Sequence, residues 1–140
     1  MAILGLDYGE KRIGVALANG EGALAVPVAV VKRTELASDL DSLAVFARDY
    51  RVERVVVGLP WSLDGSIGPQ AQEVLAFVDV LARHVKLPVD TWDERFSSTG
   101  ADNLLLDAGT KKARRKERRD AVAAAIILQG YLDHGKRFEE

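Results

Sequence analysis

Three acidic residues from distant parts of the sequence, Asp7, Glu94 and Asp120, are candidates for metal-assisted chemistry. Asp7 ends an apolar run that is typical of a buried strand, and glycines on either side leave room around its carboxylate. Glu94 comes after PVDTW, which predicts a short strand over 88–92. We therefore expect Glu94 beyond the carboxyl end of that strand, where open α/β sheets bind ligands.

Asp120 lies on the apolar stripe of the last predicted helix, which spans about 112–133. Residues three, four, seven, eight and eleven positions later share its helix face. These residues are Ala123, Ala124, Ile127, Leu128 and Tyr131. Because alanine is small, we expect this helix to pack closely on the sheet and to hold the Asp120 carboxylate against the strands. An unpaired charge in that position would be unfavourable.

The three carboxylates share one pocket if the first strand is central and the fifth runs parallel to it. Like charges gathered in this way repel one another, so such a cluster usually holds a cation. Carboxylate oxygens without cysteine or histidine nearby favour Mg²⁺ or Mn²⁺. Two such ions assist attack on a phosphodiester, one by generating hydroxide and the other by stabilising the leaving oxygen. The pattern therefore predicts cleavage of phosphodiester bonds.

Each carboxylate also has a structural interpretation, in which it pairs with a nearby cation instead of binding a metal. The pairs are Asp7 with Lys11 or Arg12, Glu94 with Arg95, and Asp120 with Lys116. Asp93 remains the alternative to Glu94 as a metal ligand. Each structural interpretation is reasonable alone, but all three together, with this spacing, are less so.

A basic segment directly precedes Asp120. Residues 111–119, KKARRKERR, carry seven Lys or Arg and one Glu, a charge of +6, so the rest of the chain sums to −2 − 6 = −8. Such a run is usually a solvated helix face, but here it can grip a polyanionic backbone beside the metal. The expected contacts are Lys111, Lys112, Arg114, Arg115, Lys116, Arg118 and Arg119, with Arg12 and Arg95 as further candidates for which ion pairing is an equal alternative.

The remaining pattern predicts the elements that position these residues. Strands are expected over 2–8, 12–18, 23–31, 53–59 and 88–92, and helices around 36–46, over 70–85, over 97–109 and over 112–133. Three strands joined by hairpins, followed by strands separated by helices, predict a mixed five-stranded α/β sheet with right-handed crossovers. Pro27 places the third strand at an edge or breaks it. Thr34 or Ser38 and Gly135 are expected helix caps.

Composition limits the alternatives. A chain of 140 residues that is 48% hydrophobic predicts one domain over residues 1–140. It has no cysteine, which excludes disulfides and cysteine-based zinc sites. No apolar run approaches the roughly 18 residues of a membrane span, and the start lacks the pattern of a signal peptide. We therefore expect a cytoplasmic protein without a membrane partner.

Four ordered segments carry a family resemblance: LGLDYGEKRIGVAL, VVVGLPWSLDGSIGPQA, DERFSSTGA and KKARRKERRDAVAAAIILQGYL. Together they resemble the YqgF family, also called RuvX, of Holliday junction resolvases more recently named pre-16S rRNA nucleases. The resemblance implies an RNase H-like fold with strand order 3-2-1-4-5. It also implies a metal-binding triad that falls on Asp7, Glu94 and Asp120. Ala18-Asn19 and Trp61-Ser62 depart from the residues common in the family.

The expected function is a divalent-metal-dependent nuclease acting on structured nucleic acid, with processing of the 5′ end of pre-16S rRNA first and resolution of DNA Holliday junctions as the alternative. Two weaker alternatives stay open. An actin-like nucleotide-binding module is one, because D-x-G-x-x-R also resembles a phosphate loop, and a catalytically silent RNA-binding module is the other. A monomer suits trimming of an RNA end, whereas a homodimer suits a two-fold junction.

Overall fold

The computed structural model describes residues 2–20, 23–60, 67–93 and 112–138, with the side chains of the last helix described over 119–134. Its elements are β1 (Ala2–Tyr8), β2 (Arg12–Ala18), β3 (Val26–Lys32), α1 (Leu36–Asp49), β4 (Val52–Leu59), α2 (Pro69–Val85), β5 (Val89–Asp93) and α4 (Lys112–Phe138). Every element predicted within these ranges is present. The helix predicted over 97–109 lies outside the described residues. Within the described ranges, no helix is both long and apolar enough to span a membrane.

The described strands form one mixed sheet in the order β3-β2-β1-β4-β5. β1 pairs antiparallel with β2 and parallel with β4, while β2 pairs antiparallel with β3 and β4 parallel with β5. β1 is therefore central, and β5 runs parallel to it, so their carboxyl ends meet at the same edge of the sheet. The predicted strand order is confirmed.

β3 shows how a proline is accommodated in this sheet. It begins at Val26 rather than at residue 23, and it carries Pro27 on an edge strand, where a missing N–H is tolerated. The β2–β3 register shifts between Val15 and Ala16, opposite Pro27. The edge position predicted for this strand is confirmed.

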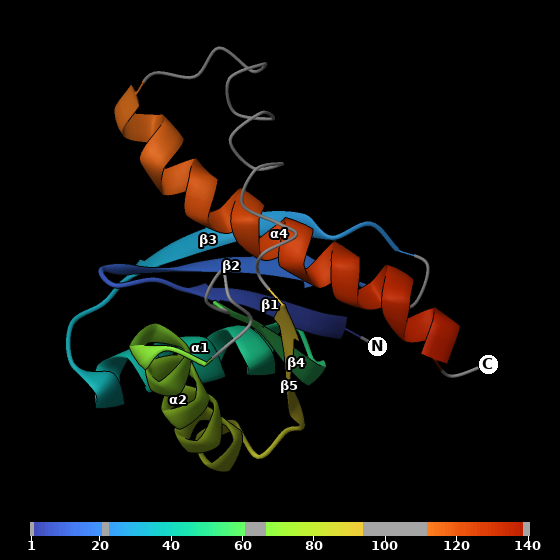
Figure 1. Cartoon of the computed structure of the whole chain (residues 1–140), viewed down its shortest axis with the longest axis horizontal. Coiled ribbons are helices and arrows are strands. Elements are labelled where there is room, and N and C mark those ends of the chain that lie inside the picture. Colours follow the sequence, from blue (N-terminus) through green and yellow to red (C-terminus); the bar gives the residue numbers. More distant parts are fainter. Residues whose placement is uncertain (1, 21–22, 61–66, 94–111, 139–140) are drawn as a thin grey trace.

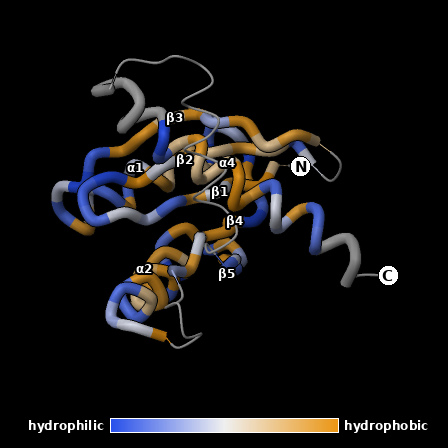
Figure 2. The backbone as a smooth tube through the Cα atoms, turned by 45° about the horizontal axis from the view of Figure 1, so that its top comes forward, coloured by the Kyte–Doolittle hydropathy of each residue, from blue (hydrophilic) through white to orange (hydrophobic). Residues whose placement is uncertain are grey.

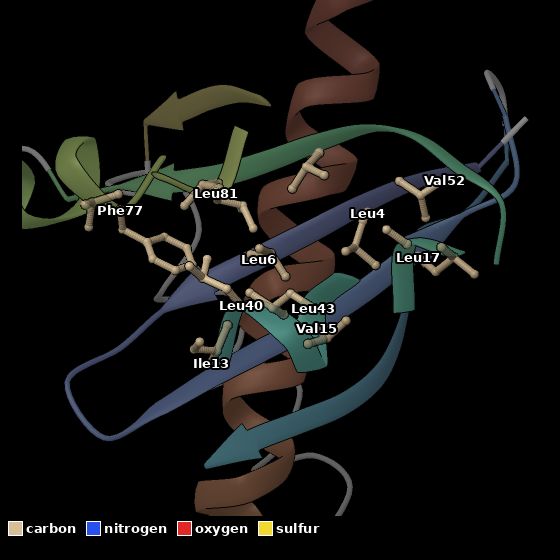
Figure 3. Close-up of a cluster of buried hydrophobic side chains, with 14 of the residues drawn as sticks. Leu4, Leu6, Ile13, Val15, Leu17, Leu40, Leu43, Val52, Phe77 and Leu81 are labelled. Atoms are coloured by element: carbon tan, nitrogen blue, oxygen red, sulfur yellow. The ribbon is translucent and has the colours of Figure 1, made fainter. Parts of the chain in front are cut away.

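Helices cover both faces of the sheet: α1 and α2 lie on one, and α4 crosses the other (Figure 1). Because alternate strand residues point to the same face, the face toward α1 and α2 receives large apolar side chains. Leu4, Leu6, Ile13 and Val15 are essentially inaccessible there (Figure 3). Each such side chain stabilises the fold by roughly 1.5–3 kcal/mol. Figure 2 shows hydrophobic stretches of the backbone along the strands at the middle of the molecule.

The opposite face allows a close approach of α4. Gly5 and Gly14 lie beneath the helix: a Cβ on Gly5 would stand 2.7 Å from Cβ of Leu128, and a Cβ on Gly14 would stand 1.8 Å from the carbonyl oxygen of Asp120. Buried residues of this interface are Ile3, Val56, Ala124, Ile127 and Leu128. The close packing predicted for this helix is confirmed, and the strands contribute to it as much as the helix does.

The predicted helix caps are wrong. Neither Thr34 nor Ser38 caps α1, because the N-cap residue is Glu35, which makes no side-chain cap hydrogen bond. Instead, the buried carboxylate of Asp39 accepts hydrogen bonds from the Thr34 amide (3.0 Å) and hydroxyl (3.4 Å). Gly135 lies inside α4, where an interior glycine costs roughly 1 kcal/mol relative to alanine and a helix of 27 residues tolerates it.

Candidate active site

Asp7 lies on the face of the sheet that α4 covers. Along β1, Ile3 belongs to the α4 interface and Gly5 lies under the helix, so Asp7 continues the same alternation and is half-buried. Its cross-strand neighbour on β2 is Gly14. Because the backbone of Asp120 packs against Gly14, the two carboxylates predicted to act together are brought to the same part of the α4 face.

Arg12 forms an ion pair with Asp120 in this region. Its Nε donates a hydrogen bond to Oδ2 of Asp120 at 2.7 Å, and the two side chains are 30% and 24% exposed. Arg12 begins β2 two residues before Gly14, so it points to the same face as Gly14. The structural interpretations paired Asp7 with Lys11 or Arg12 and Asp120 with Lys116, and they did not include the Arg12–Asp120 pair. A charge-assisted hydrogen bond of this kind offsets the free-energy cost of partly burying the Asp120 carboxylate.

The end of β5 separates the two candidates for the third ligand. Trp92 faces α4, because a Cβ on Gly130 would stand 2.8 Å from the Trp92 Nε1. Val89 packs in the core under α1 and α2, so Asp93, an even number of residues after Val89, belongs to that other face. Asp93 thus lies on the opposite face from Asp120. Glu94 lies outside the described residues.

The carboxyl ends of β1 and β5 are in register across the sheet. Leu6 pairs with Val57 on β4, and Val57 pairs with Thr91 on β5. Position 93 is therefore level with Tyr8, at the edge where Asp7 lies. Among the residues that the structure describes, no three metal-ligating side chains come together.

The expected nucleic-acid contacts are described only in part. Arg119 is exposed, and the first turns of α4 project beyond the sheet past β3 (Figure 1). The backbone of 112–118 belongs to these turns, but its side chains lie outside the description. Lys111 and Arg95 also lie outside the described residues, as do Trp61 and Ser62.

Arg33, which was not among the predicted site residues, holds the turn that follows Asp7. Nη1 of Arg33 donates hydrogen bonds to the carbonyl oxygens of Gly9 (2.9 Å) and Glu10 (3.0 Å). The same guanidinium lies 4.3 Å from the ring centroid of Tyr8, which stacks on Phe77 at 3.9 Å. Burial raises the pKa of Tyr8 above its usual value, and the positive charge of Arg33 partly offsets this. No local pattern signals the contact of Arg33 with this turn, because its partners are more than twenty residues apart.

A second polar network ties the later part of α4 to the sheet. The hydroxyl of Tyr131 donates to Oδ2 of Asp90 at 2.5 Å, and Nη1 of Arg54 donates to the Tyr131 oxygen at 2.8 Å and to Asp90 at 3.1 Å. Burial, followed by the hydrogen bond to Asp90, raises the pKa of Tyr131. The periodicity predicted that Tyr131 faces the sheet, but it did not predict these partners.

Comparisons with known sequences cover nearly the whole chain. The family model described as "RuvX: Holliday junction resolvase" matches residues 1–134. A protein of Desulforamulus reducens named "Putative pre-16S rRNA nuclease" is 42% identical over 137 residues, which cover 98% of this chain and 100% of that relative. A protein of Symbiobacterium thermophilum with the same name is 49% identical over 133 residues, which cover 95% of this chain and 92% of the relative.

Solved structures share the fold. Thermus thermophilus RuvC in complex with a Holliday junction substrate superposes with a TM-score of 0.62 at 21% identity, covering 96% of this chain and 97% of that one. The fowlpox virus Holliday junction resolvase superposes with a TM-score of 0.59 at 13% identity, covering 96% of this chain and 99% of that one. The mixed sheet with helices on both faces is thus the RNase H-like fold that the resemblance implied.

Proposed function

The chain belongs to the RuvX family of Holliday junction resolvases, and from this membership we propose that it is a hydrolase, a divalent-metal-dependent nuclease that cleaves phosphodiester bonds of structured nucleic acid. The observation that carries the proposal is the meeting of Asp7, Arg12 and Asp120. Two consecutive strands and a helix that is distant in sequence bring two carboxylates and a guanidinium to one part of the α4 face. A structural role alone does not require two carboxylates and a guanidinium beside the glycines on which the helix packs.

The substrate that we propose is the 5′ end of pre-16S rRNA, which the relatives' name supports. The description of the family favours a second candidate, the four-way DNA junction. A protein that processes ribosomal RNA would work in the cytoplasm. As a monomer it could trim an RNA end, whereas paired cuts in a two-fold junction require a homodimer.

We assign Asp7, Glu94 and Asp120 as the ligands of Mg²⁺ or Mn²⁺. Carboxylate oxygens are the donors that these hard cations prefer, and the Asp120 carboxylate already holds a cationic group, the Arg12 guanidinium. The alternation along β5 favours Glu94 over Asp93, because only every second residue shares the face of Trp92. When bound, the metal supplies an activated water and stabilises the leaving oxygen.

The protein's own groups would hold the substrate. Arg12 has the planar donor geometry that binds phosphate, and its place beside Asp120 would put that phosphate next to the metal ligands. Asp120 is held by a helix that packs against Gly14 and Gly5, so its position depends on a rigid contact rather than on a loop. Further along the nucleic acid, the proposed backbone contacts are Lys111, Lys112, Arg114, Arg115, Lys116, Arg118 and Arg119, with Arg95 as a further candidate.

The test is cleavage of a labelled pre-16S rRNA fragment and of a four-way DNA junction, each with Mg²⁺, with Mn²⁺ and with chelator. We expect cleavage of at least one substrate with metal and none with chelator. Glu94→Gln should abolish cleavage, whereas the matched variant Asp93→Asn should retain it. Cleavage that continues in Glu94→Gln and stops in Asp93→Asn would contradict the assignment of the third ligand.

A further inference from the structure

A groove next to the proposed active site has no role in the function described so far. It lies between the edge strand β3 and α4, has a volume of about 550 Å³, and is lined in part by Val30, Lys32, Ala121 and Val122. This volume lies within the range of roughly 300–1,000 Å³ that is typical of ligand sites. Arg12 also lines the groove. Because Arg12 contacts Asp120 as well, the groove adjoins the proposed active site.

The wall of the groove is aliphatic and only half-buried. Val30 pairs with Gly14 in the β2–β3 register and therefore points toward α4. Val122 faces it from the helix, two residues after Asp120, and both valines keep part of their surface accessible. An apolar surface of this kind suits the sugar and base of a nucleotide.

The charge at the mouth of the groove is positive. Lys32 is the direct cross-strand neighbour of Arg12, and both point to the α4 face. Two like charges in such a pair are unfavourable unless an anion lies nearby. Asp120 supplies that anion for Arg12, but the exposed ammonium of Lys32 makes no hydrogen bond or ion pair within the described part of the chain. An anionic ligand at Lys32 would complete the arrangement.

An added peptide strand is a poorer occupant. β3 is an edge strand, but it carries Pro27 within it and Lys32 at its end. Proline and lysine are the residues with which edge strands avoid pairing with other strands. The basic sequence of 112–119, in the part of α4 that projects past β3, further favours a polyanion on this side (Figure 1).

We propose that the groove between β3 and α4 binds one nucleotide of the substrate strand adjacent to the scissile phosphate, with its sugar and base against Val30 and Val122 and its phosphate at Lys32. The proposal rests on the proposed nuclease function, which supplies the strand. It extends the binding path from Arg12 along the edge of the sheet toward the projecting end of α4.

Disulfide trapping tests this placement directly. The chain has no cysteine, so Val122→Cys introduces a unique thiol in the groove. The matched control is Val45→Cys on α1, where Val45 is 44% exposed on the other side of the sheet. The probes are the pre-16S rRNA fragment and the four-way DNA junction, each carrying thiol tethers on phosphates near the cleavage position, with chelator present. We expect at least tenfold more cross-linked product with Val122→Cys than with Val45→Cys.

A salt titration of binding provides the second measurement. Lys32→Gln should make the slope of log K against log salt shallower by about 0.7–0.9, as expected for the loss of one phosphate contact. Arg48→Gln, an equally neutralising change on α1, should leave the slope unchanged. Equal trapping by the two cysteine variants would overturn the proposal and leave the groove to a peptide or to a second copy of the chain. An unchanged slope in Lys32→Gln would overturn the placement of a phosphate at Lys32.

The two proposals fail in different ways. If the wild-type protein cleaves a substrate but Val122→Cys traps no more than its control, the nuclease stands and the groove proposal falls. If Val122→Cys traps the nucleic acid but the wild type cleaves neither substrate with metal, the groove binds nucleic acid and the nuclease proposal falls.

Discussion

On β1, Leu4 and Leu6 point toward α1 and α2, whereas Gly5 and Asp7 point toward α4. Adjacent residues of one strand thus serve two different environments. The first face is filled by large aliphatic side chains that are removed from water. The second face has glycines at the helix crossing and charged groups beside it.

The contrast continues on β2, where Ile13 and Val15 fill the first face and Arg12 and Gly14 lie on the second. The α4 face gives up apolar area, since each glycine buries no side chain. In return, the helix backbone comes close enough to hold the Asp120 carboxylate against the sheet. Both faces therefore bury apolar residues, but only the α4 face also holds the Arg12–Asp120 ion pair beside its glycines.

The largest expected effects separate the two faces at neighbouring positions. Leu6→Ala should lower the free energy of unfolding by about 2–5 kcal/mol, because it leaves a cavity in the core. Asp7→Asn should change it by less than about 1 kcal/mol, because it removes a charge that is only partly buried. Cleavage should fall by roughly 10³-fold or more in Asp7→Asn, because the loss of a metal ligand raises the activation free energy by several kcal/mol. Urea denaturation and single-turnover cleavage at 25 °C measure the two effects.

Folded Leu6→Ala protein should cleave at nearly the wild-type rate. Asp49→Asn, at an exposed carboxylate on α1, is the control for Asp7→Asn and should change neither property. Retained cleavage in Asp7→Asn would remove this residue from the metal site and with it the contrast between the two faces.

Gly14→Ala tests the close contact on the α4 face. The added Cβ would stand 1.8 Å from the Asp120 carbonyl oxygen, so the helix must shift. We expect a loss of about 1–3 kcal/mol of stability from overpacking. Cleavage should fall more than stability alone explains, because Asp120 moves with the helix. Single-turnover cleavage by fully folded variant protein measures this, and a wild-type rate there would show that the position of Asp120 is not critical.

Arg12→Gln should have a smaller effect on stability. The ion pair with Asp120 is partly exposed and screened by solvent, so its loss should cost about 1 kcal/mol or less. We expect binding of the uncleaved substrate to weaken and its salt dependence to become shallower, because a phosphate contact is lost. Fluorescence anisotropy at several salt concentrations reports both. Arg12→Lys, which keeps the charge but not the fork of donors, should retain the slope and lose part of the affinity.

The smallest expected effect concerns Tyr131, whose pKa is raised in the folded protein. Above pH 10 the unfolded chain ionises this hydroxyl before the folded one does, so its contribution to stability is complete below pH 10 and declines as the pH rises further. Tyr131→Phe should lose about 0.5–1.5 kcal/mol at pH 8, when its hydrogen bonds are removed. The gap between the wild type and Tyr131→Phe should then narrow above pH 10 in urea denaturation. A gap that widens instead would contradict the direction of the shift.

Local patterns were sufficient for the elements. Alternation predicted the strands, and helical spacing placed Ala124, Ile127 and Leu128 on the sheet-facing side of α4, where all three are inaccessible. The family resemblance supplied the strand order. These predictions succeed because the periods of two and 3.6 residues follow from the backbone itself and require no knowledge of distant partners.

The predictions of the N-cap residue failed because the choice depended on burial. Thr34 and Ser38 have the right side chains for an N-cap, but the buried Asp39 takes the Thr34 amide and hydroxyl. Competition among nearby polar groups is decided by which of them the core buries, and a local pattern contains no information on burial.

The sequence by itself therefore determined the elements, the candidate carboxylates and, through resemblance, the family. Only the tertiary structure decided that Arg12 binds Asp120, that Arg33 clamps the turn after Asp7, and that a groove opens between β3 and α4. The physical reason is the crossing of α4 over β2. Where that helix touches the sheet depends on the absence of a side chain at Gly14, and the pairing of Asp120 with Arg12 follows from that contact. The position of Arg33 depends instead on the pairing of β3 with β2, which brings the residue after β3 beside the turn that follows Asp7.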